Sequence, residues 1–199
     1  ILWIYSGTGF SIMSTANKIL MGASGGGGPS GPSDDQFNRT SFLSHFEGSN
    51  NGVNNVFDDS SASNHTVTAN ANITQGSFSP FSRPDGEWGV SFDGDGDYLT
   101  VAASNDFDVS DGDITIEGFF NFTSNAVESA LWTLSIDNND ANGIRFQRQT
   151  TGFLRFDVRS GNSYVVNVTD NTISIPLNTW HHVAVTRTSG GDWKVYVNG

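Results

Sequence analysis

The sequence contains no cysteine, which excludes a disulfide framework and thiol chemistry. Basic residues are also scarce, because nine Lys and Arg stand against 21 Asp and Glu and give a formal net charge of -12. Such a charge repels a phosphate backbone and an anionic lipid surface, so we expect no nucleic-acid partner. No apolar run approaches the length of a membrane-spanning helix, and no membrane insertion is expected.

Aromatic residues and glycine are abundant instead. Aromatics make up 12% of the chain, with 15 Phe, and there are 23 Gly, whereas charged residues reach only 15%. Bulky β-formers combined with small turn-forming residues are typical of an all-β sandwich. A length of 199 residues suits one domain with a tail.

The first part of the chain is predicted to be a separate, flexible N-terminal segment over residues 1–24. Residues 1–12 are apolar but follow no basic residue, unlike a secretory signal, and one interpretation is that they are upstream translation. Residues 13–24 then form a candidate docking peptide. Residues 25–36, rich in Gly, Pro and Ser, are predicted to be a linker. The domain itself is expected over 37–199.

Beyond Ser41 the apolar residues recur mostly with period two, which predicts many short antiparallel strands. In 114–122, Ile114, Ile116, Phe120 and Phe122 share the inward face, and in 153–159 the inward set is Leu154, Phe156 and Val158. Further strands are predicted near 88–93, 97–102, 130–136, 143–149, 163–168, 180–187 and 193–197. Two sheets packed face to face would bury these stripes, which predicts a two-sheet antiparallel β-sandwich.

The stretch FDGDGDYLTV, residues 92–101, places three aspartates at alternate positions. Counted from Asp93, however, the sixth residue is Tyr98 and the twelfth is Ser104, so the pattern of a helix-loop-helix calcium site fails at both positions. The Gly and Asp residues between two strand-like segments favour a β-hairpin turn. The alternative is a calcium ion held by oxygens from separate loops, for which the candidate ligands are Glu47, Asp58, Asp59 and Asp93.

No catalytic pair of carboxylates is evident on a predicted strand. Glycoside hydrolysis needs two carboxylates at a set spacing, whereas Glu117 stands alone between Ile116 and Gly118 and is predicted to face solvent. His181 and His182 are adjacent on a predicted strand, so they point to opposite faces and cannot bind one metal ion together. These observations predict that the domain is not an enzyme.

Several segments, taken in order, resemble a concanavalin A-like, laminin-G-like jelly roll of the type found in bacteriophage tail and appendage proteins. They are SFLSHFEGSNN, VFDDSSASNHTVT, WGVSFDGDGDYLTV, ITIEGFFNF and NTWHHVAVTRTSGGDWKVYVNG, and together they lie within residues 37–199. The last is the most specific. The resemblance implies a two-sheet sandwich, often with calcium near its rim, that commonly binds carbohydrate without catalytic residues.

The resemblance also implies further strands beyond Gly199, so the domain is predicted to lack its last strands. An open sheet edge would favour self-association into an oligomer. The resulting hypothesis is a noncatalytic module of a phage virion appendage, extracellular on the particle, that binds host-surface carbohydrate through rim loops. One alternative is a structural decoration domain that contacts other virion proteins through its N-terminal segment. The other is a glycan-cleaving enzyme.

Overall fold

The computed structural model describes residues 2–4, 10–13, 19–23, 39–46, 56–76, 79–81, 88–109, 112–135 and 142–199. The strands are β1 (Leu2–Ile4), β2 (Phe10–Met13), β3 (Ile19–Ala23), β4 (Phe42–Ser44), β5 (Val67–Asn70), β6 (Thr74–Gly76), β7 (Trp88–Phe92), β8 (Tyr98–Val101), β9 (Ile114–Phe122), β10 (Ser129–Ser135), β11 (Gly143–Arg148), β12 (Phe153–Ser160), β13 (Ser163–Ser174), β14 (Trp180–Arg187) and β15 (Lys194–Val197). In this part of the chain no helix is long and apolar enough to cross a membrane.

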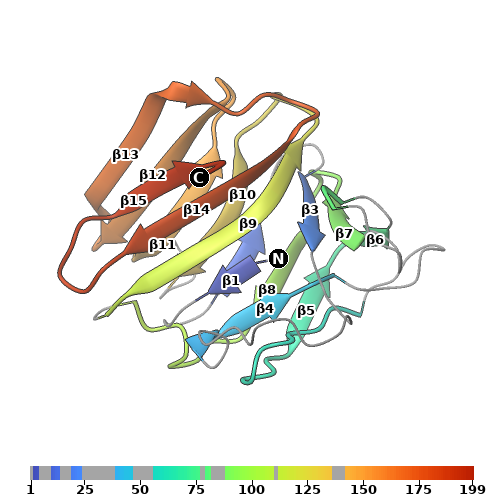
Figure 1. The fold of residues 1–199 in the computed structure, drawn as a ribbon, viewed down its shortest axis with the longest axis horizontal. Coiled ribbons are helices and arrows are strands. Elements are labelled where there is room, and N and C mark those ends of the chain that lie inside the picture. The colour runs from blue at the N-terminus through green and yellow to red at the C-terminus, as the bar shows by residue number, and fades with distance from the viewer. Residues whose placement is uncertain are drawn as a thin grey trace.

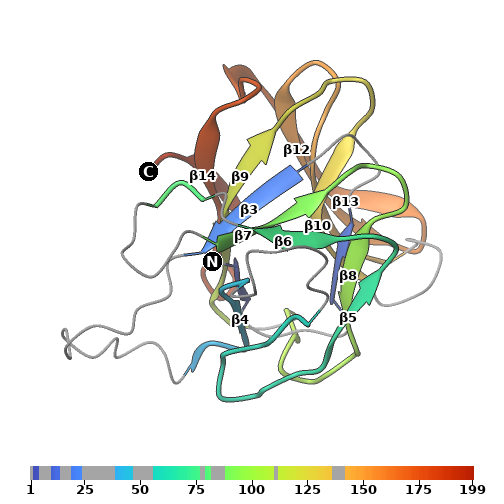
Figure 2. The same ribbon diagram turned by 90° about the vertical axis from the view of Figure 1, so that its right-hand side faces the viewer.

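The strands of the described residues form two antiparallel sheets (Figure 1). One sheet has eight strands in the order β15-β14-β9-β3-β7-β6, with β1 joined to β9 and β4. The other has seven strands in the order β13-β12-β11-β10-β2-β8-β5. Figure 2 shows β14, β9 and β3 on one side of the molecule and β12, β13, β8 and β5 on the other. The predicted antiparallel β-sandwich is therefore confirmed.

The core lies between the two sheets and uses the predicted apolar stripes. On β9, Ile116 and Phe122 are fully buried, and on β12 Leu154 and Phe156 are at most 3% exposed. The rings of Trp132, Phe146 and Phe156 lie 5.6 to 6.3 Å apart between their centroids, so three neighbouring strands share one aromatic cluster. Burial of each such ring contributes roughly 2 kcal/mol of transfer free energy.

The stretch 92–101 is not a hairpin, contrary to the prediction. β7 pairs with β6 and β3, whereas β8 pairs with β2 and β5, so the turn between them crosses from one sheet to the other. Gly94 and Gly96 have φ angles of 88° and 79° in this crossing, values that favour glycine. Turn residues indicate that the chain reverses, but they do not say which strand it pairs with next.

The structure describes three strands within residues 1–24, the range predicted to be a separate segment, and that division of the chain stays a prediction. β2 lies between β10 and β8, and β3 lies between β9 and β7, so both occupy inner positions of the sheets. Both backbone edges of each strand are paired, so neither strand leaves an open sheet edge. Their sequences, FSIM and ILMGA, are mainly apolar. The predicted linker, residues 25–36, lies outside the described residues.

Candidate functional site

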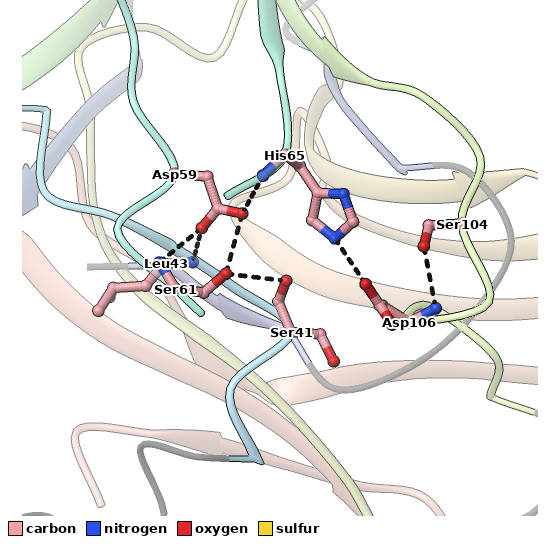
Figure 3. A network of polar contacts seen from close by, with 7 residues as sticks. All are labelled: Ser41, Leu43, Asp59, Ser61, His65, Ser104 and Asp106. Carbon is pink, nitrogen blue, oxygen red and sulfur yellow. Dashed lines mark hydrogen bonds and ion pairs between the residues drawn. The ribbon is translucent and has the colours of Figure 1, made fainter. Parts of the chain in front are cut away.

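The structure describes three of the four predicted calcium ligands, Asp58, Asp59 and Asp93. Glu47 lies outside the described residues and Asp58 is exposed, whereas Asp59 is only 4% exposed. Oδ1 of Asp59 accepts hydrogen bonds from the backbone N–H groups of Leu43, at 3.0 Å, and Ser61, at 2.9 Å. Its Oδ2 accepts from the Ser61 hydroxyl, at 2.9 Å, and from the His65 N–H, at 2.8 Å (Figure 3). A metal ion at either oxygen would have to displace a donor.

Asp93 belongs to a different network, at the crossing between the sheets. Its Oδ1 accepts from the N–H of Asp95 at 2.8 Å and its Oδ2 accepts from the side-chain amide of Asn72 at 3.0 Å. Asp97, 1% exposed, accepts from the N–H of Asp93 at 2.7 Å and from the N–H of Asn72 at 3.1 Å. The Asp95 N–H lowers the pKa of Asp93, whereas burial raises the pKa of Asp97.

These two carboxylates therefore hold a turn through backbone donors. Among the residues that the structure describes, no group of three or more His, Asp and Glu side chains is placed to hold a metal ion. The calcium site stays a prediction, since one of its four candidate ligands falls outside those residues.

A loop that follows β8 is anchored to the segment around Asp59. Nε2 of His65 lies 3.1 Å from Oδ2 of Asp106, and the His65 ring centroid lies 4.7 Å from that of Phe107. The Ser104 hydroxyl accepts a hydrogen bond from the Asp106 N–H at 3.1 Å (Figure 3). These contacts hold residues 104–109 at one end of the sandwich.

This loop forms one wall of a cleft of about 250 Å³, which we call the end cleft. Phe107 and Val109 come from the loop, and Arg187 and Trp193 come from the eight-stranded sheet and the turn after it. The apolar wall from the seven-stranded sheet is made by Leu134, Ile144 and Val158. The end cleft therefore lies between the two sheets, where the ends of several strands meet.

Arg187 is fixed in place on the wall of the end cleft. Its Nη2 donates to the carbonyl oxygen of Val109 at 2.5 Å and to that of Gly112 at 3.4 Å, and its guanidinium lies 4.8 Å from the centroid of the Trp193 ring. Its Nε is buried and has no hydrogen-bond acceptor among the residues that the structure describes. An unpaired buried donor costs about 1 to 3 kcal/mol, a cost that an acceptor reaching this atom would remove.

Arg159, which also lines the end cleft, connects it to the outer face of the seven-stranded sheet. Its Nη2 donates to the hydroxyl of Tyr164 at 3.0 Å, and its guanidinium lies 4.6 Å from the centre of that ring. Beside it, fully buried Asp157 accepts from Arg145 at 3.1 Å and from Arg155 at 3.0 Å. Arginine and tyrosine side chains thus form a continuous surface from the sheet face to the end cleft.

Sequence reasoning missed this surface. Asp157 alternates with the predicted inward residues of 153–159, which does not predict its complete burial under two arginines. The sequence does contain a sign of this cationic surface, because five of the seven arginines of the chain fall within residues 145–187. Alternation along a strand gives the face of each residue but not which neighbouring strand lies beside it.

The two histidines of β14 lie as predicted, on opposite faces of the sheet. His181 is 7% exposed, and its Nδ1 lies 3.3 Å from the side-chain amide nitrogen of Asn198. His182 faces outward, and its Nε2 lies 3.1 Å from Oε2 of Glu117 on β9. Glu117 is thus outward-facing as predicted, but it is paired with a histidine and is only partly exposed.

Comparison with known proteins gives one family. A family model described as the concanavalin A-like lectin/glucanases superfamily matches residues 93–199, more than half of the chain. No curated protein and no solved structure gives a significant match. The matched residues run from the inter-sheet crossing to the end of the chain and include every residue of the end cleft named above.

Proposed function

Because the chain belongs to the concanavalin A-like lectin/glucanases superfamily, we propose that it is a noncatalytic carbohydrate-binding module that serves adhesion. The observation that supports this proposal is the end cleft, which combines apolar walls with guanidinium donors fixed by the fold. Ligand sites are usually concave and mainly apolar, with a few placed polar groups that fix orientation. The end cleft has this composition, and the tyrosine and arginine side chains beside it extend the contact surface.

A sugar has the chemistry to occupy such a site. The C–H face of a pyranose ring packs on apolar and aromatic side chains, and its hydroxyls accept and donate hydrogen bonds. Ile144 and Val158 provide the apolar contact in the end cleft, and Arg187 and Arg159 provide donors. Tyr164, which is 44% exposed, offers a ring and a hydroxyl to the next residue of a glycan on the outer face.

The proposed absence of catalysis rests on the neighbours of the acidic residues. Glycoside hydrolysis uses two carboxylates that flank the scissile bond. Glu117 is paired with His182 on the outer face of the other sheet, and Asp157 is fully buried between two arginines. Release of reducing sugar by the wild type, abolished in Glu117→Gln, would instead identify a glycan-cleaving enzyme.

We also propose that the module belongs to a phage virion appendage and contacts glycans of the host surface. This rests on the resemblance of the sequence segments to phage tail and appendage domains. Immunogold labelling of particles with an antibody against residues 37–199 tests the location, and labelling of host cells alone would contradict it. The alternative of a decoration domain predicts labelled particles whose domain binds no glycan.

The function is tested with a glycan array probed by the labelled chain, with and without calcium. Binding to a defined set of glycans, lost in Val158→Asp, is the expected result, because a carboxylate at this half-buried position of the apolar wall disfavours the sugar face. An array without signal in both conditions would refute carbohydrate binding. Signal that requires calcium would support the calcium site predicted from Glu47, Asp58, Asp59 and Asp93.

A further inference from the structure

We infer that the glycan bound at the end cleft carries a single carboxylate, held by Arg187 and Arg159, so that the ligand ends in an acidic sugar. This inference rests on the proposed function and specifies its ligand. It depends on the charge of the end cleft, the hydrogen bonds of Arg187 and the size of the space.

The charge of the end cleft differs from that of the whole molecule. The chain has a formal net charge of -12 and nine Lys and Arg in all. Among the described residues, Arg187 and Arg159 line the end cleft together with one carboxylate, that of Asp108. The described lining is therefore cationic in an acidic protein, and a negative group on a ligand finds a favourable potential beside these two arginines.

Arg187 supplies the strongest contact for a carboxylate. The carbonyl oxygens of Val109 and Gly112 hold its Nη2, so its guanidinium is oriented before a ligand binds. Its Nε is buried and finds no acceptor among the described residues, and a carboxylate oxygen that reached this atom would supply one. A hydrogen bond between two charged groups is roughly twice as strong as a neutral one, which favours a carboxylate over a sugar hydroxyl at this atom.

The size of the end cleft and the charge of the protein limit the ligand to one acidic residue. A volume of about 250 Å³ lies just below the roughly 300 Å³ at which sites for drug-sized ligands begin, so it suits a single sugar ring. A polyanionic glycan would be repelled by the net charge outside the cleft. An isolated uronic acid at the end of a neutral glycan avoids that repulsion.

The experiment uses matched pairs of oligosaccharides, each ending in glucuronic or galacturonic acid, beside the carboxyl-reduced partner of the same linkage. Affinity is measured by calorimetry for the full chain. We expect the acidic member of one pair to bind at least about tenfold more tightly, a difference of about 1.4 kcal/mol. We expect Arg187→Gln and Arg159→Gln to remove that preference. Arg39→Gln, an exposed arginine that does not line the end cleft, should leave it unchanged.

The outcomes separate the two proposals. Equal affinity for both members of each pair would overturn the acidic ligand and leave carbohydrate binding intact. A preference that persists in both arginine variants would place the carboxylate elsewhere and overturn the site. If neither the pairs nor the array gives binding, the proposed function fails and the inference fails with it. Because the ligand-side comparison uses the wild-type chain, it remains decisive even if Arg187→Gln does not fold.

Discussion

Nε2 of His65 lies 3.1 Å from Oδ2 of Asp106, and this contact joins two segments that are far apart in the sequence. The pair becomes an ion pair when His65 is protonated. It lies directly beside Phe107, whose fully buried ring forms part of the end cleft. The position of one wall of the cleft therefore depends on a contact made outside it.

Asp106→Ala should loosen this wall with little effect on global stability. The Asp106 side chain is 46% exposed, and a contact of that exposure contributes about 1 kcal/mol or less. The amides of Phe107 and Asp108 donate to Ser104 and Asn105 carbonyls in the same loop, so hydrogen exchange at these two amides reports its opening. We expect faster exchange there in Asp106→Ala. Unchanged exchange would show that the pair does not hold the loop.

Asp59→Asn should destabilise the domain by about 2 to 3 kcal/mol. An asparagine replaces one acceptor oxygen with an amide donor, which then faces a donor such as the His65 N–H. Asp58→Asn is the matched control, because that neighbouring side chain is exposed, and it should stay within about 0.5 kcal/mol of the wild type. Urea unfolding measures both. Equal effects of the two variants would contradict a structural role for Asp59.

Much of the fold could be predicted from the sequence, because alternation indicates which side chains of a strand point to the core. The strands at 114–122 and 180–187 were predicted with the same ends as β9 and β14, and the four residues of 114–122 predicted to face inward are buried. The predicted strand at 163–168 is longer in the structure, where β13 continues to Ser174. Its polar second half gives no alternation, because β13 is an edge strand with many exposed residues. Short strands such as β6 contain too few residues to show a period.

The candidate site was harder to predict, because it depends on which segments are neighbours in space. Asp59 was chosen for its charge, but its buried oxygens are filled by backbone donors from 43, 61 and 65. The end cleft joins residues near 107, 144, 159 and 187, and no local motif links them. Which strands pair, and how the two sheets pack, brings these residues together, and the spacing of residues along the chain does not show it.

Gly152→Ala should be more harmful than Gly161→Ala, although both glycines have positive φ angles, of 89° and 57°. The left-handed conformation costs alanine roughly 1 kcal/mol at either position. A Cβ at residue 152 would also lie 3.1 Å from the Ser174 hydroxyl and 3.3 Å from Nη2 of Arg148, whereas no atom lies within 4 Å at residue 161. We expect a further loss of about 1 to 2 kcal/mol for Gly152→Ala. Thermal melts of the two variants test the difference.

His181 should make the domain less stable as the pH falls below about 6.5. Burial, and then the charge of Arg148, lower the pKa of His181 from its ordinary value of 6.5. The unfolded chain therefore takes up a proton at a higher pH than the folded chain, and stability falls by at most about 1.4 kcal/mol per pH unit for this single proton. His181→Gln should flatten the stability profile between pH 7 and 5. His182→Gln, on the opposite face, should keep the wild-type slope of stability against pH. A flat profile for His182→Gln would contradict the assignment of this slope to His181.

Asp97→Ala should destabilise the crossing between the two sheets far more than Asp95→Ala. Asp97 is buried and accepts from the N–H groups of Asp93 and Asn72, so its loss leaves two backbone donors without their partner, at a cost of about 2 kcal/mol. Asp95 contributes its backbone N–H to Asp93, and alanine retains that group. If the three aspartates instead held calcium, both substitutions would weaken a calcium-induced rise in melting temperature. Melting curves of the three proteins with calcium and with a chelator distinguish a turn held by hydrogen bonds from one held by a cation.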